Sequence, residues 1–217
     1  MAAVVINSYD TLQAAVADWL NRGDLLDQIP AFITLAEAQM NRELRTRDMM
    51  VRADATSDGE NVLLPDDWLE HYSLTVQPGP PPAPQGYLAK PLRYMSEKES
   101  NEIKAAMFGQ PGIPYGYTVI GNMIELVPAP TDDVDLRMVY YAKIPNLSTL
   151  LQSNWLLGKS PDLYLYSTLL QSAPYLKDDD RLGTWAQIRG ALFEMIRMES
   201  EFSLRPRSQI TARAKAF

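Results

Sequence analysis

The periodicity of apolar residues changes twice along this chain of 217 residues, and this change limits the fold that the chain can adopt. At both ends apolar residues recur at helical spacing. Between Met49 and Asn146, prolines and glycines separate short alternating runs that are typical of strands and turns. We therefore predict an α+β fold, in which N-terminal and C-terminal helix pairs form one helical bundle and an antiparallel β module is inserted between them.

Four segments follow from this pattern. Residues 1–48 hold the first helix pair, 49–146 the β-rich module with one short helix, 147–203 the second helix pair, and 204–217 a basic, extended C-terminal arm. The length suits either one large domain or a compact domain that carries an inserted one.

The first helix pair has recognisable ends. Ser8 is a residue type that caps helix N-termini, and Asn21-Arg22-Gly23 is a stop signal. The second helix is predicted to begin near Asp27, with Pro30 in its first turn, and to end near Arg45. The predicted inward stripes are Leu12, Ala15, Val16, Trp19 and Leu20 in the first helix, and Ile29, Ile33, Ala36, Met40 and Leu44 in the second.

The β-rich segment is predicted to form an antiparallel meander. A short helix follows Ser96, and a hairpin over residues 115–127 turns at Gly121-Asn122. A third strand is expected over residues 134–143, and we predict no parallel βαβ unit.

The single histidine, His71, lies in an alternating strand. The alternation places Tyr72, Leu74 and Val76 on one face and His71 on the other, with the polar residues Ser73, Thr75 and Gln77. We therefore predict a surface histidine.

A proline-rich run at residues 78–86 is predicted to be an exposed loop with polyproline character. Its prolines include Pro80, Pro81, Pro82 and Pro84. An alternative is a recognition segment that docks in an aromatic groove.

The tripeptide Gly158-Lys159-Ser160 matches the end of a phosphate-binding loop, but its surroundings do not. The first glycine of that motif is replaced by Ser153, and Pro161 removes a backbone N–H near the position of a phosphate. We predict instead a helix that starts at Ser160 and is interrupted or ended by Pro174.

A last helix is predicted after Asp178-Asp179-Asp180, with Leu182, Trp185, Ile188, Leu192, Met195 and Ile196 facing inward.

The residue inventory argues against an enzyme, a cofactor or a metal site. No cysteine is present, and Asp178-Asp179-Asp180 is a weak metal signal because consecutive side chains point in different directions. Nothing resembles a membrane span or a signal peptide, so we expect synthesis in a cytoplasm.

Charge is distributed unevenly. The chain carries a net −7, which argues against general affinity for nucleic acid. Residues 205–217 hold four basic residues and no acidic ones, so the remainder has 16 basic against 27 acidic residues, a net −11. This basic end is either a segment that binds an acidic partner or a solvated terminus.

The order and spacing of packing and turn residues resemble the phage adaptor proteins, which connect the head to the tail in short-tailed phages. The residues that carry this resemblance are Tyr9-Asp10-Thr11-Leu12, Trp19-Leu20, Ile29-Pro30-Ala31-Phe32-Ile33, Ala36-Glu37, Arg42-Glu43-Leu44-Arg45, Leu64-Pro65-Asp66-Asp67-Trp68-Leu69-Glu70, Gly112-Ile113-Pro114-Tyr115-Gly116-Tyr117, Leu126-Val127-Pro128-Ala129-Pro130, Tyr140-Tyr141, Leu147-Ser148, Asn154-Trp155-Leu156-Leu157 and Pro161-Asp162-Leu163-Tyr164-Leu165-Tyr166. They cover nearly the whole chain.

The resemblance implies a structural virion protein, one subunit of a ring of about twelve copies between the portal protein and the tail nozzle protein. It implies that the β module faces the tail, which would make the prolines of the 78–86 loop tail-facing. It also implies that the C-terminal arm lies on the portal. The candidate portal-binding residues are Arg205, Arg207, Arg213, Lys215 and Phe217. Genomic DNA would pass through the ring without sequence-specific binding.

Two other classes of protein stay open. One is a peptide- or protein-binding module that uses the proline-rich loop or the β module and forms no ring. The other is an enzyme.

Overall fold

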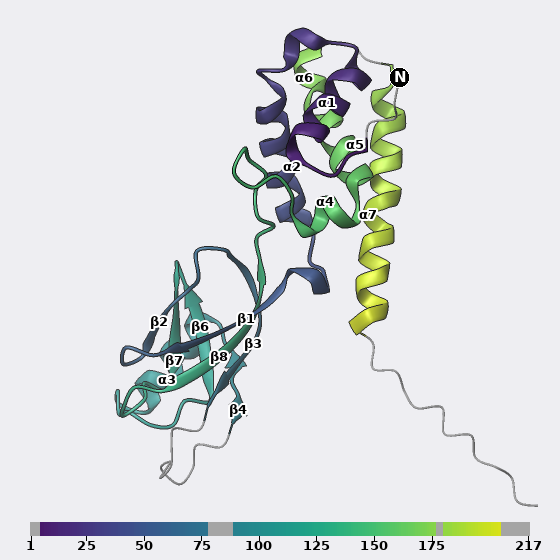
Figure 1. Ribbon diagram of the computed structural model, residues 1–217. Coiled ribbons are helices and arrows are strands. Elements are labelled where there is room, and N and C mark those ends of the chain that lie inside the picture. Colours follow the sequence, from purple (N-terminus) through teal and green to yellow (C-terminus); the bar gives the residue numbers. More distant parts are fainter. Residues whose placement is uncertain (1–4, 78–88, 177–179, 205–217) are drawn as a thin grey trace, which may run out of the picture. The chain divides into compact units, whose positions relative to one another are not determined.

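The computed structural model of the protein (Figure 1) describes residues 5–77, 89–176 and 180–204. It is a mixed α+β structure that divides into two compact units. Residues Met1–Asp48 and Ile144–Phe217 make up the first, here called the helical unit. Residues Met49–Lys143 make up the second, here called the β unit.

The helical unit is organised around helix α5. Its helices are α1 (Tyr9–Leu20), α2 (Ile29–Glu43), α4 (Trp155–Lys159), α5 (Pro161–Gln171), α6 (Ala173–Leu176) and α7 (Leu182–Leu204), with short 3-10 turns at Gly23–Leu25 and Arg47–Met49. Helix α5 contacts α1, α2, α4, α6 and α7. Its side chains Leu163, Tyr164 and Leu169 are fully buried, so α5 supplies the centre of this core.

The predicted ends of the first helix are confirmed. The Ser8 side chain accepts a hydrogen bond from the Thr11 N–H, and the Thr11 hydroxyl oxygen accepts one from the Ser8 N–H, which forms a capping box. Asn21 ends the helix in the left-handed region, with φ 52°. The prediction of an inward Trp19 was wrong: 42% of this residue is exposed, and its ring packs edge-on against Tyr166 at the rim of the unit.

The last helix, α7, confirms part of its predicted stripe. Trp185 and Ile196 are buried and Ile188 and Leu192 are partly buried, but Met195 is 61% exposed. Among the described elements, α7 packs mainly against α5, and this packing leaves Met195 outside the buried face. Asp178 and Asp179, predicted to start this helix, lie outside the described residues.

A buried carboxyl group connects α2 to α5. Glu37 is 1% exposed, and its Oε1 accepts hydrogen bonds from the Leu147 N–H at 2.8 Å and the Tyr164 hydroxyl at 3.1 Å. Asn154 donates to the Tyr164 oxygen at 2.6 Å. Burial raises the pKa of Glu37, against the lowering effect of these two donors, and burial also raises the pKa of Tyr164. The hydroxyl therefore stays protonated and remains a donor.

The Glu37→Gln variant should gain stability relative to the unmodified chain as pH rises. Because the folded pKa of Glu37 lies above its ordinary value of 4.5, the stabilising contribution of the protonated carboxyl is complete below that value and is lost as pH rises through the folded pKa. Glutamine retains the Oε1 acceptor and never ionises. Denaturant unfolding at several pH values measures the difference between the two proteins. If the difference in free energy of unfolding between the two proteins stayed constant with pH, the raised pKa of Glu37 would be contradicted. Glu102→Gln, with a 67% exposed side chain, is the control.

The β unit contains two four-stranded sheets that share one core. The first has the order β1 (Met50–Thr56), β8 (Asp135–Ala142), β3 (Trp68–Val76), β4 (Lys90–Pro91), and the second β2 (Asn61–Leu63), β7 (Met123–Val127), β6 (Gly116–Ile120), β5 (Arg93–Tyr94). Buried side chains from both sheets, including Leu74, Met138 and Tyr140 from the first and Ile124 and Leu126 from the second, form a single cluster. Helix α3 (Glu97–Ala106) follows β5.

The structure corrects the predicted meander. The hairpin of β6 and β7 is confirmed, with Gly121 at φ 61° in its turn, but β8 leaves that sheet and pairs with β1 and β3 in the other. Pro128 and Pro130 in the linker lack the N–H groups that would extend the β7 ladder, so the chain is free to cross between sheets.

The expectation that no parallel βαβ unit is present was also wrong. Strands β5 and β6 pair in parallel, with Arg93 opposite Gly116 and Tyr94 opposite Tyr117, and helix α3 connects them. A strand of two residues is too short to show a periodicity, so the sequence pattern did not reveal it.

The predicted orientation of His71 was wrong because the strand contains a bulge. The register shifts between His71 and Ser73, so His71 lies on the same side of the strand as Leu74. Its half-buried ring stacks on Tyr94, with centroids 4.6 Å apart, and meets Tyr117 edge-on at 5.7 Å. Tyr72 is 53% exposed instead.

Candidate assembly surface

The residues predicted from the sequence to contact partners lie outside the part of the chain that the structure describes. This applies to Arg205, Arg207, Arg213, Lys215 and Phe217, and to Pro80, Pro81, Pro82 and Pro84. The structure does describe helix α7, which ends at Leu204, immediately before the basic segment.

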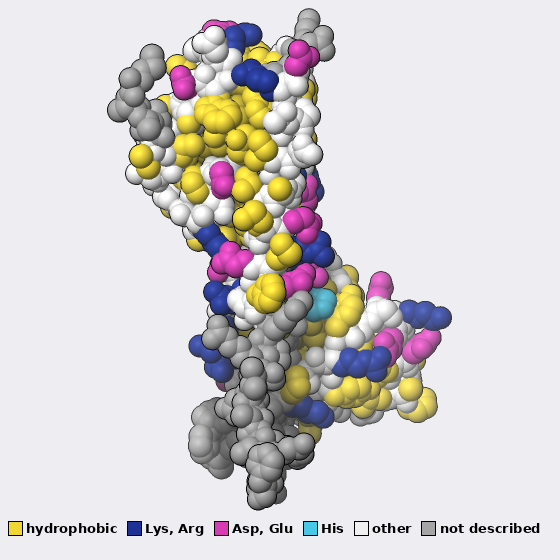
Figure 2. All heavy atoms as spheres, turned by 90° about the vertical axis from the view of Figure 1, so that its right-hand side faces the viewer, with side chains coloured by type: hydrophobic (Ala, Val, Ile, Leu, Met, Phe, Trp, Pro, Cys, Tyr) yellow, Lys and Arg dark blue, Asp and Glu magenta, His cyan; other side chains and the backbone are white. Residues whose placement is uncertain are grey.

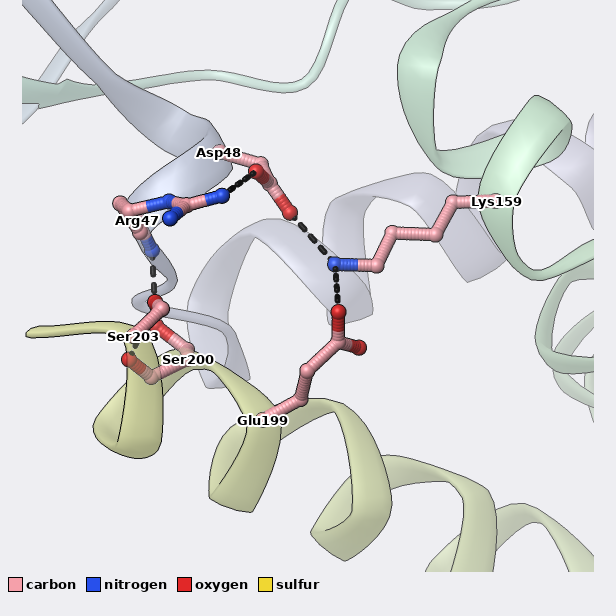
Figure 3. A network of polar contacts seen from close by, with 6 residues as sticks. All are labelled: Arg47, Asp48, Lys159, Glu199, Ser200 and Ser203. Atoms are coloured by element: carbon pink, nitrogen blue, oxygen red, sulfur yellow. Dashed lines mark hydrogen bonds and ion pairs between the residues drawn. The ribbon is translucent and has the colours of Figure 1, made fainter.

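A polar network holds the C-terminal part of α7 against the rest of the helical unit (Figure 3). The Lys159 Nζ lies 2.7 Å from the Asp48 carboxylate and 3.1 Å from that of Glu199 on α7. The Arg47 N–H donates to the Ser200 hydroxyl at 2.8 Å, and Ser200 is 8% exposed. Three separate segments therefore meet near the last turns of α7.

Electrostatics favour this arrangement. The hydrogen bond that Lys159 donates to the Asp48 carboxylate is the main cause that raises the pKa of Lys159, and Glu199 adds to it, so the amine stays charged. The Lys159 side chain is 31% exposed, and solvent screening keeps each ion pair weak. The network therefore specifies the position of α7 more than it stabilises the fold.

The same geometry explains Gly158-Lys159-Ser160. Gly158 and Lys159 form the last turn of α4, and the Ser160 N–H donates to the Leu156 carbonyl at 2.7 Å. The predicted helix start is confirmed at Pro161, but the Ser160 side chain makes no capping hydrogen bond, because Ser160 also ends α4. Two carboxylates occupy the Lys159 amine, which leaves this lysine engaged in an internal contact rather than free to bind a phosphate.

The sequence pattern did not predict helix α4. Asn154 is its cap and accepts a hydrogen bond from the Leu157 N–H at 2.9 Å. Asparagine before Trp155-Leu156-Leu157 was the available signal. Glu37 was also missed, although its place inside the apolar stripe between Ile33 and Met40 marks it as a buried acid.

The outer side of α7 exposes large apolar side chains. Met195 is 61% exposed, Met198 53% and Phe202 70%. Figure 2 shows hydrophobic side chains gathered on the side of the helical unit where α7 lies in Figure 1. Met195 and Met198 line a groove of about 410 Å³ between α7 and the junction of α4 and α5, together with Leu192, Ser160 and Asp162. Exposed apolar surface of this kind makes the outer side of α7 the candidate assembly surface.

Two other kinds of feature, a metal site and a membrane-spanning helix, were sought in the described residues. Within residues 5–77, 89–176 and 180–204, no group of three His, Asp or Glu side chains is placed to hold a metal ion. Among the helices of the described ranges, none combines the length and the apolar character that crossing a bilayer requires.

The sequence of this chain matches a known protein family. The family match defines the class of protein: a phage adaptor, a structural component of the virion. The chain belongs to the family described as SU10 adaptor protein, which it matches over residues 7–211. The resemblance seen in the sequence is thereby confirmed. No curated protein matches the chain.

Proposed function

We propose that this chain is a subunit of the adaptor ring that joins the portal protein of a phage head to the tail. The observation that carries the proposal is the family match, which extends over residues 7–211 and so includes both units and the first residues of the basic segment. In this proposal the ring contains about twelve copies, closes the connection around the DNA channel and serves as the platform for the tail nozzle protein.

The charge distribution supports a division of roles. The four basic residues after Leu204 reach an acidic or grooved surface of the portal, while the remainder of the chain carries a net −11. A negatively charged body suits a channel through which DNA passes, because like charge suppresses contacts with phosphate. The β unit, with its proline-rich 78–86 loop, then contacts the tail.

The anchoring of α7 supports the role of the basic segment. Lys159, Asp48 and Glu199 hold the helix within two turns of its end at Leu204, so the segment starts from a defined position. Starting a binding segment from a fixed point lowers the entropy lost when it binds.

Deletion of residues 205–217 should abolish capture of the protein by the portal of the same phage while leaving a folded chain. Binding is measured by co-sedimentation with assembled portal, and folding by circular dichroism. A second variant replaces Arg205, Arg207, Arg213 and Lys215 by glutamine, which separates charge from length. Binding of the full chain should also weaken as salt is raised.

The matched control removes the same amount of charge elsewhere. It replaces four exposed basic residues of the β unit by glutamine: Arg52, Lys90, Lys98 and Lys143. This control should bind the portal like the unmodified chain. Normal incorporation of the truncated chain would overturn the role of the basic segment, and absence of portal binding by the full chain would overturn the proposed function.

A further inference from the structure

We propose that the outer stripe of α7 packs against the outer face of α2 in the next copy of the chain. This inference rests on the proposed function, since it names the surfaces by which neighbouring subunits of the ring meet. A cyclic ring requires one contact, made between two different faces and repeated from copy to copy.

The first face is a heptad-like stripe on α7. Ile188, Ala191, Met195, Met198 and Phe202 follow one another at alternating steps of three and four residues. This is the spacing of a helix seam that packs against another helix. A neighbouring face of α7 already packs inward through Trp185, Ile196 and Ser200. The helix therefore has two apolar faces, and the described part of its own subunit packs on one of them.

The second face is on α2 and has the complementary shape. Ala31, Leu35, Ala38 and Arg42 are exposed and follow the same alternation, at steps of four, three and four residues. Leu35 is 52% exposed. The small alanines on either side of it leave room for larger knobs such as methionine and phenylalanine. The inward face of α2 is separate and carries Ile33, Ala36 and Met40.

The positions of the two helices favour a contact between copies. Both α2 and α7 pack on α5, and Figure 1 shows them on opposite sides of it. Met195 and Met198 border a groove beside Ser160 and Asp162. Ala31, Leu35 and Ala38 of α2 are exposed, so the α7 stripe of one copy does not cover the α2 face of the same copy. Rotation about a common axis brings the two faces of neighbouring copies together, as a ring requires.

Charge complementarity agrees with this pairing. Arg42 flanks the α2 face and has no ion-pair partner in the described part of the chain. The α7 stripe is flanked by Glu194 and Glu201, with Arg197 between them, and these side chains are more than half exposed. Within one copy, Arg189 of α7 reaches Glu43, the neighbour of Arg42, at 2.6 Å. In the proposed pairing, Arg42 of the next copy lies near Glu194 and the two side chains form an ion pair.

Cross-linking tests the pairing directly, because the chain contains no cysteine of its own. The Ala38→Cys/Ala191→Cys variant, treated with a short bismaleimide, should give a ladder of covalent oligomers that extends beyond the dimer. Each single variant should remain monomeric, and a mixture of the two single variants should stop at the dimer. Dimers from Ala191→Cys alone would mean that α7 pairs with itself, and would overturn the inference.

The experiment is run on the free chain and on the chain bound to the portal. A chain that binds the portal but gives no ladder in either state overturns this inference and leaves the proposed function intact. A ladder from a chain that does not bind the portal supports the pairing and overturns the proposed function.

A charge exchange provides an independent readout. Arg42→Glu should reduce the yield of oligomers in the cross-linking reaction at least several-fold, and adding Glu194→Arg should restore it. Both residues are exposed, so the fold should be unaffected. Glu102→Arg on α3 of the β unit is the matched control and should leave the yield unchanged. A double variant that stays as weak as Arg42→Glu contradicts the proposed ion pair.

Discussion

Replacing Leu163 by alanine is expected to lower the free energy of unfolding of the helical unit by about 2–5 kcal/mol. Leu163 is fully buried on α5, the helix that contacts every other helix of the unit. Alanine would leave a cavity in the core of the helical unit, and close-packed helices cannot move freely to fill it. The effect is therefore expected at the high end for a single substitution in this unit.

Tryptophan fluorescence during denaturant unfolding measures this loss. Trp19, Trp155 and Trp185 belong to the helical unit and Trp68 to the β unit, so a Trp68→Phe background reports the helical unit alone. Leu150→Ala is the control, because Leu150 is 96% exposed in the same unit, and its effect should stay within about 0.5 kcal/mol. Equal losses for Leu163→Ala and Leu150→Ala would contradict the central position of α5.

Replacing Gly116 by alanine is expected to destabilise the β unit by about 1–3 kcal/mol. A Cβ at this position would overlap the Met95 Cε, lie 2.7 Å from the Met95 Sδ and lie 3.1 Å from the Arg93 carbonyl oxygen. Met95 is 2% exposed and has little room to move, and Arg93 is the parallel-strand partner of Gly116. The added methyl group should therefore separate β5 from β6.

Two further variants identify the cause. Met95→Val shortens the obstructing side chain, so Gly116→Ala should cost less in that background than in the unmodified chain. Gly190→Ala lies inside α7 with no atom within 4 Å of the added Cβ, and it should stabilise the helical unit by about 0.5–1 kcal/mol. Denaturant unfolding measures all of these changes. A Gly116→Ala protein as stable as the unmodified chain would show that β5 and β6 do not require this close approach.

Local chemistry accounts for the features that the sequence predicted correctly. Ser8 and Asn21 bound α1 through hydrogen bonds and a backbone conformation that involve only neighbouring residues. Gly121 turns the β6–β7 hairpin for the same reason, since it adopts a positive φ without strain. Such signals depend on a few consecutive residues, so they can be recognised without knowing which distant segments pack nearby.

The incorrect predictions concern features that depend on residues far apart in the sequence. The face that His71 presents depends on a bulge opposite β8, whose partner residues lie about 70 positions further along the chain. The exposure of Met195 depends on how much of α7 the side of α5 can cover. Both are settled by packing against distant segments, about which a local pattern carries no information.

The candidate assembly surface was likewise predicted in part from the sequence and in part revealed only by the structure. The sequence pattern identified the basic residues of the 205–217 segment and the apolar residues of the last helix, but it predicted a single inward face for that helix. The structure divides the apolar residues of α7 into a face that packs on α5 and an outer stripe. It also shows Lys159 joining Asp48 to Glu199, a contact between residues far apart in the sequence.

The sequence by itself determined the order of helical and β-rich segments, the ends of α1 and the resemblance to phage adaptors, because periodicity, capping and turn residues act over a few positions. Only the tertiary structure decided the exchange of β8 between sheets, the burial of Glu37 and the exposure of the α7 stripe. These depend on which surfaces remain uncovered after distant segments pack together, and that competition for burial is a property of the whole chain.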